Sequence, residues 1–105
     1  MTHVVAFHAQ QCVEKCFKAV LEQQNHRVPK DHSTIRLSAM VKNFFDEILV
    51  EDILTDLDDL YIEARYPADL GFLPYGKPNK DDALQFLQFA EKIFARACQI
   101  LDYRR

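Results

Sequence analysis

Apolar residues recur at helical spacing through nearly the whole chain, and this periodicity limits what the chain can fold into. The pattern covers about residues 4–24, 31–44, 47–65 and 81–101. Only two glycines and four prolines are present, too few for the many tight turns of an all-β fold, and no strand pattern is visible. We therefore predict an all-α, up-and-down bundle of about four helices in a single domain, residues 1–105. The apolar positions of the last helix are Ala83, Phe86, Leu87, Ala90, Ile93, Phe94, Ala97 and Leu101.

The breaks between these segments carry signals for helix ends. Asp31 or Ser33 can cap the second helix. Pro67 closes the third helix, since the residue before a proline is pushed out of helical geometry. Asp81 and Asp82 suit the positive N-terminus of the fourth helix. The connections are therefore expected to be short, apart from a longer loop that follows Pro67.

The charges are unevenly distributed along the chain. Residues 1–43 hold six Lys and Arg against three Asp and Glu, whereas residues 44–69 hold nine acids and one arginine. The net charge of −3 excludes an extended nucleic-acid surface, which needs a basic surplus to neutralise phosphates. No apolar run reaches the ~18 residues of a membrane span, and no signal peptide is visible. Three cysteines, an odd number, favour a reducing compartment, so we expect a cytoplasmic protein.

The sequence gives little support for a metal site or for a nucleophilic or phosphate-loop site. His8, Cys12 and Cys16 lie four positions apart on one flank of a helix, as zinc ligands can, but no fourth ligand is assignable. The cysteines are therefore expected to pack as small apolar residues, and we predict neither a metal nor a cofactor. No nucleophile elbow or phosphate-binding glycine loop is present either.

Several polar residues allow two interpretations each. Gln11, Glu14, Lys15 and Lys18 share one face of the first helix, which is either a solvated surface with a Glu–Lys pair or a binding stripe. Arg65 either neutralises the last carbonyls of the third helix or presents its planar fork to a phosphate. Arg27 and His32 match the form Arg-x4-His of a catalytic pair, a short pattern that also arises by coincidence.

Four segments in order carry a resemblance to a known family. They are FHAQQCVEKCFKAVL (7–21), DHSTIRL (31–37), YIEARYP (61–67) and DDALQFLQFAEKIF (81–94). Together they resemble a HEPN domain, a name that refers to nucleotide binding in higher eukaryotes and prokaryotes. The resemblance implies a small helical bundle, usually dimeric and often encoded beside a minimal nucleotidyltransferase in a toxin–antitoxin-like module. The ligand-binding positions that it implies are Gln11, Glu14, Lys15, Lys18, His32, Arg65 and Tyr66, with Pro67 beside them.

Two departures from the family pattern affect the expected function. The ribonuclease branch of the family carries its Arg-x4–6-His pair on a late helix, but no histidine follows His32 here. Members also usually begin with another amphipathic helix, so the chain is expected to lack that helix, to expose apolar area, and to form a homodimer.

We therefore expect a binding subunit for a nucleotide or phosphate-bearing ligand, more often non-catalytic, with a minimal nucleotidyltransferase as its partner. The first alternative is a metal-independent endoribonuclease toxin that uses His32 with Arg65 or Arg27. The second is a purely structural oligomerisation module.

Overall fold

Four α-helices account for nearly all the secondary structure of the described part of the chain. The structure is a computed structural model, and it describes residues 2–24, 26–45, 48–64 and 79–102. The helices are α1 (Thr2–Gln23), α2 (Thr34–Phe45), α3 (Glu51–Ala64) and α4 (Lys80–Asp102). These ranges contain no strand, so the prediction of an all-helical bundle is confirmed.

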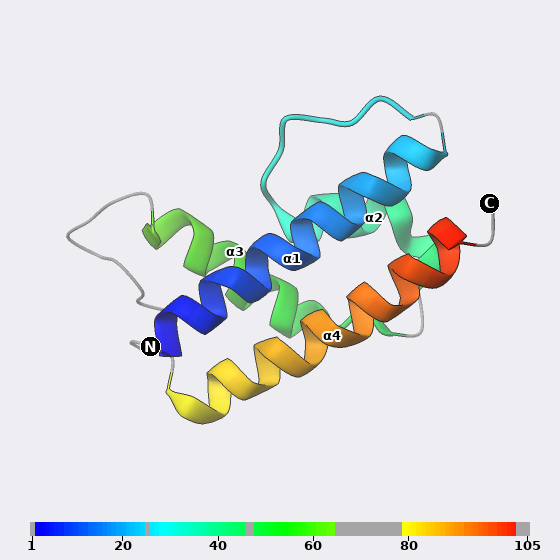
Figure 1. Ribbon diagram of the computed structural model, residues 1–105. Coiled ribbons are helices and arrows are strands. Elements are labelled where there is room, and N and C mark those ends of the chain that lie inside the picture. Colours follow the sequence, from blue (N-terminus) through cyan, green and yellow to red (C-terminus); the bar gives the residue numbers. More distant parts are fainter. Residues whose placement is uncertain (1, 25, 46–47, 65–78, 103–105) are drawn as a thin grey trace.

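The two long helices, α1 and α4, form one side of the bundle, and α2 and α3 form the other. Figure 1 shows that α1 and α4 run side by side in the same direction, with α2 and α3 behind them. α1 contacts each of the other three helices and makes its most extensive contacts with α4. α1 is thus the central element of the fold, so any polar residue on its inner face must find partners within the bundle.

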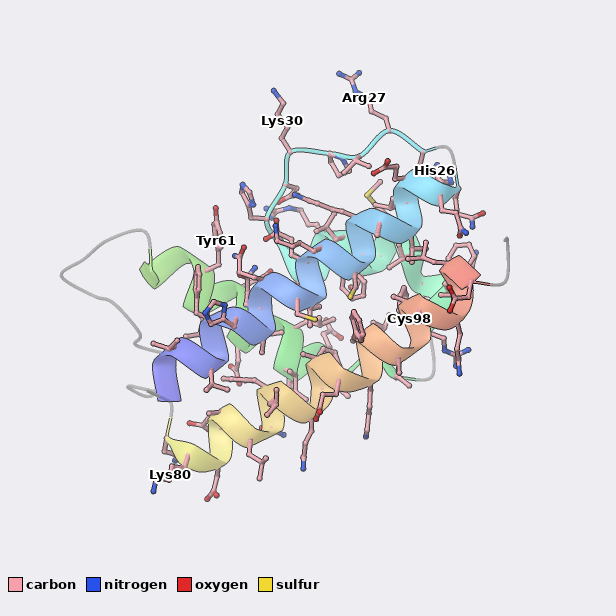
Figure 2. The ribbon with its side chains drawn as sticks, in the orientation of Figure 1. His26, Arg27, Lys30, Tyr61, Lys80 and Cys98 are labelled. Atoms are coloured by element: carbon pink, nitrogen blue, oxygen red, sulfur yellow. The ribbon has the colours of Figure 1, made fainter. Side chains whose placement is uncertain are left out.

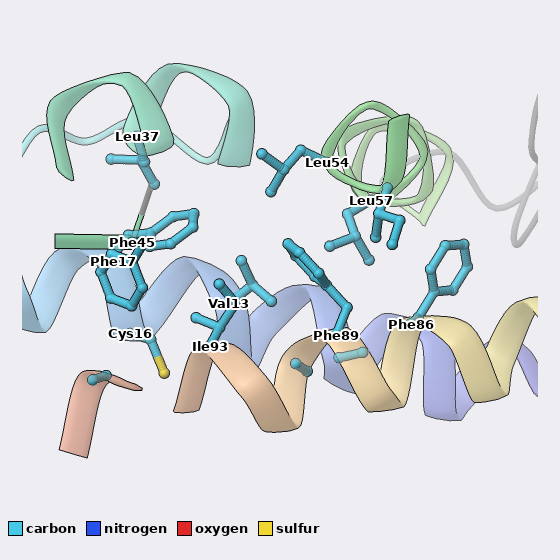
Figure 3. Close-up of a cluster of buried hydrophobic side chains, with 14 of the residues drawn as sticks. Val13, Cys16, Phe17, Leu37, Phe45, Leu54, Leu57, Phe86, Phe89 and Ile93 are labelled. Atoms are coloured by element: carbon cyan, nitrogen blue, oxygen red, sulfur yellow. The ribbon is translucent and has the colours of Figure 1, made fainter. Parts of the chain in front are cut away.

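A single apolar cluster fills the space between the helices. Phe17 of α1 and Phe45 of α2 meet edge to face, with ring centroids 5.2 Å apart, a favourable geometry for aromatic pairs. Figure 3 shows side chains from all four helices converging on this cluster. Its largest fully buried members are Phe17, Leu21, Leu37, Phe45, Leu54, Leu57, Leu60, Phe86 and Ile93.

Some apolar residues that helical spacing assigns to the core are not fully buried. On α2, the spacing places Phe44 on the apolar side, but Phe45 is buried and Phe44 is half-buried against the core. On α4, Phe89 is buried, whereas Leu87 and Phe94 are exposed. The reason is that α4 is apolar on two adjacent sides, and spacing alone does not tell which side faces the core.

The N-terminus of α4 is capped by a reciprocal pair. The Asn79 side-chain oxygen accepts a hydrogen bond from the Asp82 N–H at 2.8 Å, and the Asp82 carboxylate accepts one from the Asn79 N–H at 3.0 Å. This arrangement satisfies two of the N–H groups that a helix start leaves without partners. Asp82 was expected at this helix start, but Asn79 was not.

None of the helices in the described ranges has the length and apolar character needed to cross a membrane.

Candidate functional site

A buried carboxylate, that of Glu14, lies at the centre of the polar contacts between α1 and the loop that leads into α2. One of its oxygens, Oε2, is 3.0 Å from Nζ of Lys18 and 3.0 Å from Nδ1 of His32. The other, Oε1, accepts a hydrogen bond from Nε2 of Gln10 at 3.1 Å. Both oxygens are therefore satisfied, as a buried charge requires.

Two glutamines extend this network along α1. Nε2 of Gln11 donates to Oε1 of Gln10 at 2.7 Å, and Gln10 in turn donates to Glu14. Gln10 is fully buried, so its side-chain amide needs hydrogen-bond partners, and it finds two on its own helix, Gln11 and Glu14. A chain of bonds from Gln11 through Gln10 to Glu14 results, and it fixes the orientation of the carboxylate.

His32 is held from two directions. Because an ionised carboxylate can only accept hydrogen bonds, Nδ1 of His32 carries the proton in its contact with Glu14. The imidazole also stacks on the Tyr61 ring of α3, with centroids 4.7 Å apart and planes 18° apart. Nε2 has no hydrogen bond to any described residue, and the side chain remains 46% exposed. Nearly half of the His32 side chain is therefore accessible to solvent, while Nδ1 and the ring are held by Glu14 and Tyr61.

The first N–H groups of α2 are occupied by a carboxylate from α3. Asp58 accepts hydrogen bonds from the Thr34 N–H and from the Thr34 hydroxyl, the latter at 2.8 Å. It also accepts one from the Ser33 hydroxyl at 2.6 Å. The positive start of a helix favours an anion, and here the protein supplies its own through Asp58. Ser33 caps α2 as predicted, since its hydroxyl oxygen accepts from the Arg36 N–H at 3.2 Å.

A pocket of about 250 Å³ opens beside His32 and Tyr61. Asp31 and Arg36 form a two-pronged ion pair at its rim, with Nη2 of Arg36 2.7 Å from Oδ1 of Asp31. Lys30 also lines it, and Figure 2 shows its side chain projecting from the loop between α1 and α2. The pocket thus combines an aromatic surface with both cationic and carboxylate groups.

Two carboxyl groups of this region have lowered pKa values. Burial alone would raise the pKa of Glu14, but hydrogen bonds from His32, Lys18 and Gln10 outweigh it and lower the pKa below its ordinary value. The Arg36 guanidinium, helped by the Ser33 N–H, holds the pKa of Asp31 well below its usual range. Both groups are therefore ionised at neutral pH.

The structure brings together some of the predicted ligand residues and separates others. Gln11, Glu14, Lys18 and His32 belong to one hydrogen-bonded network, whereas Lys15 of the same helix is exposed. Glu14 is buried rather than part of a solvated face, because His32 and Gln10 cover it.

Of the two arginines of the predicted sites, only Arg27 lies in the described part of the chain, and it does not belong to this network. Arg27 is exposed, does not line the pocket beside His32, and projects away from the helices in Figure 2. Arg65, together with Tyr66 and Pro67, lies outside the described residues.

Three residues of the site were not identified from the sequence. Gln10 lies next to Gln11 in the chain but was not singled out, although two adjacent glutamines on an otherwise amphipathic helix are an unusual feature. Tyr61 fits the apolar spacing of its helix, so spacing alone would assign it to the core rather than to a site. Asp58 carried no local signal, since its partners lie on another helix.

The cysteines give no metal site. Within the described ranges, no group of three or more His, Cys, Asp or Glu side chains is arranged to hold a metal ion. All three cysteines are free; Cys16 is buried in the core and Cys12 packs against it. A hydrogen bond with Cys16 lowers the pKa of the Cys12 thiol to about 7, although burial opposes the shift.

The sequence model of the HEPN domain family matches residues 1–101, nearly the whole chain. The protein therefore belongs to the HEPN domain family, and its helical bundle and its network around Glu14 are features of one member of that family. No curated protein and no solved structure matches the chain.

Proposed function

We propose that this HEPN-family protein binds a nucleotide in the pocket beside His32 and Tyr61, as an accessory subunit of a minimal nucleotidyltransferase. The observation that carries the proposal is the stacked pair itself. Its imidazole is fixed by the buried Glu14 and backed by an aromatic ring at the edge of a pocket. A planar ring held in this way needs no rearrangement before a second planar group stacks on it.

The nucleobase would lie on the open face of His32. Stacking of a base on an aromatic side chain contributes about 1–3 kcal/mol to the free energy of binding, and every base can stack in this way. Nε2 of His32, which has no partner among the described residues, can bond to the base edge or to a phosphate oxygen. The site would accordingly favour nucleotides as a class over one particular base.

The charges of the pocket favour a whole nucleotide over inorganic phosphate. Carboxylates of Asp31 and Asp58 line the pocket and would repel a bare anion. Asp58 is fully engaged at the start of α2, whereas Asp31 can still accept one hydrogen bond from a ribose hydroxyl or a base amino group. Lys30 at the rim is exposed and is available to the phosphates. Lys15, Arg65 and Tyr66 remain proposed phosphate and base contacts on the strength of the family pattern alone.

The proposal also names a partner and a cellular location. The partner would be a minimal nucleotidyltransferase encoded nearby, in a toxin–antitoxin-like module, and the location would be the cytoplasm. Three free thiols fit a reducing compartment. An adjacent nucleotidyltransferase reading frame, and co-purification of its product with this chain, would support the pairing; a chain encoded and purified without one would oppose it.

Isothermal titration calorimetry with ATP, GTP and inorganic phosphate tests the binding proposal. Both nucleotides should bind and phosphate should not. Replacing His32→Ala should weaken nucleotide binding about 10- to 100-fold, the equivalent of one lost stacking contact. His26→Ala is the matched control, because His26 is an exposed histidine that does not line the pocket. Equal nucleotide affinity in the wild type and the His32 variant would overturn the assignment.

One observation favours a second candidate, a metal-independent endoribonuclease. Glu14 holds the proton on Nδ1 of His32, so Nε2 of the neutral ring is a proton acceptor, the state that a general base needs. An RNA 2′-hydroxyl would be its target. Cleavage of RNA in the presence of EDTA that is lost in His32→Ala would support this candidate. Intact RNA after prolonged incubation with the wild type would exclude it.

A further inference from the structure

Arg36 of α2 lines the pocket beside His32, and its guanidinium is held along one edge only. Nε and Nη2 of Arg36 donate to the two carboxylate oxygens of Asp31. A guanidinium carries five N–H donors, so three of them, on Nη1 and Nη2, remain. These three have no hydrogen bond to a described residue, and the side chain is 71% exposed. Arg36 therefore presents a second, planar edge of donors that is available to a ligand.

The carboxylate that holds Arg36 is itself fixed to the backbone. Oδ1 of Asp31 accepts a hydrogen bond from the Ser33 N–H at 3.0 Å, the contact of an Asx turn. The main chain of Arg36 is fixed as well, because its N–H donates to the Ser33 hydroxyl at 3.2 Å. Both ends of the Arg36 side chain are thus held by the segment that begins α2. A guanidinium held in this way loses less conformational entropy on binding than a freely moving side chain does.

The ion pair between Asp31 and Arg36 adds little to the stability of the fold. Exposed ion pairs in general contribute little to the free energy of unfolding. The start of α2 does not depend on the pair, because Ser33 and Asp58 already accept hydrogen bonds from its first N–H groups. The fixed position of the guanidinium is therefore better explained by what it can bind.

The chemistry of the second edge matches a phosphate group. Two parallel N–H donors on a planar guanidinium fit two oxygens of one phosphate, and arginine is the side chain best suited to this contact. Lys30, the other cation that lines the pocket, is a flexible point charge without a fixed direction. Asp31 neutralises the charge of Arg36, so charge alone does not draw inorganic phosphate to the pair.

We propose that Arg36 recognises the phosphate of the nucleotide, that Asp31 positions its guanidinium, and that the pair makes the site select nucleotides over nucleosides. This role of Arg36 rests on the proposed nucleotide site and concerns the part of the ligand that the stack on His32 does not read. The base of a nucleoside can stack in the same way. Only a phosphorylated compound also reaches the donors of Arg36.

Calorimetric titration of the full chain with adenosine, AMP and ATP, in EDTA, tests this role. AMP should bind about 10-fold more tightly than adenosine, through one charge-assisted contact. Arg36→Lys keeps the charge but loses the planar fork, so it should weaken AMP and ATP binding about 5- to 10-fold and leave adenosine binding unchanged. Arg27→Lys is the matched control, because Arg27 is an exposed arginine that does not line the pocket.

Asp31→Asn separates positioning from simple charge. If the carboxylate only repelled the ligand, its removal would strengthen ATP binding. If it positions Arg36, ATP binding should weaken about 2- to 10-fold, because the guanidinium must then be ordered on binding, and adenosine binding should not change. Tighter ATP binding in this variant would overturn the positioning role of Asp31.

The three ligands also separate this role from the nucleotide site itself. Circular dichroism and thermal unfolding should be the same for Arg36→Lys and the wild type, since the side chain is exposed. Wild-type affinity for ATP in Arg36→Lys, or an equal loss for adenosine and ATP, would overturn the role of Arg36 and leave the stack on His32 in place. If none of the three ligands binds the wild type, the nucleotide site is wrong and the role of Arg36 falls with it.

Discussion

The Glu14 carboxylate lies 3.0 Å from Nδ1 of His32, and this contact joins the middle of the first helix to the residue that precedes the α2 cap. The two residues are 18 positions apart in the chain, so the contact forms only in the folded protein. It determines which nitrogen of His32 carries the proton. The buried network and the pocket are thus parts of one arrangement, in which α1 supplies the carboxylate and α3 supplies the Tyr61 ring.

Replacing Glu14→Gln should destabilise the protein by about 1–3 kcal/mol. The new amide has one NH₂ group, which would face donors such as Lys18 or Gln10 and leave a buried hydrogen bond unmade. Glu22→Gln, an exposed change on the same helix, should have an effect within about 0.5 kcal/mol. Urea unfolding at pH 7 measures both changes. Equal stability of the two variants would contradict a structural role for the network.

Glu14→Gln should also alter how the free energy of unfolding depends on pH. The pKa of Glu14 in the folded protein is lower than in the unfolded chain, where it is about 4.3. Its contribution is therefore complete above that value and is lost as the pH falls through the folded pKa. Unfolding free energies between about pH 2 and 6 should decline less steeply for Glu14→Gln than for the wild type. Parallel curves would show that Glu14 is not the titrating group.

Asp58→Asn should loosen the start of α2. The carboxylate accepts hydrogen bonds from Ser33 and Thr34, and an amide would retain only one acceptor oxygen. We expect a loss of about 1–2 kcal/mol, similar to the removal of a strong helix cap. Hydrogen exchange should show the loss of protection concentrated in α2. Asp52→Asn, an exposed change on the same helix, is the control; an equally large loss there would contradict the capping role.

Cys12 should be the most reactive of the three thiols near neutral pH, because its hydrogen bond with Cys16 lowers its pKa to about 7. Iodoacetamide should modify Cys12 with a half-maximal rate near pH 7, and Cys16→Ala should move that midpoint toward about 8.5. Trypsin cleaves after Lys15 and Lys18, so mass spectrometry follows the two cysteines on separate peptides. An unchanged midpoint in Cys16→Ala would contradict the thiol pair.

The helices and much of the core could be predicted from the sequence because they depend on spacing within one segment. Leu57 and Ile93, for example, follow from the apolar periodicity of their own helices. The exposure of Leu87 and Phe94 could not be predicted, since α4 is apolar on two sides and only its packing against α1 decides which side is buried.

The candidate site was predicted only in part, because sequence spacing reports contacts within one helix and not contacts between helices. The polar face of α1 identified Glu14 and Lys18, four residues apart on one helix, and family resemblance added His32. The stack of His32 on Tyr61 and the cap that Asp58 provides join different helices, and no local pattern reports such contacts. Gln10 could have been found, because a fully buried amide on the inner side of a helix needs polar partners nearby.

The central claim is that a nucleotide stacks on His32, and NMR of the histidine rings tests it most directly. The chain has four histidines, so the other three act as internal controls, and His32→Gln assigns the signal. Addition of ATP should shift the ring protons of His32 upfield, through the ring current of the stacked base, and should leave His8 and His26 nearly unchanged. A titration in which ATP leaves His32 unmoved, or shifts all the histidines alike, would contradict the account.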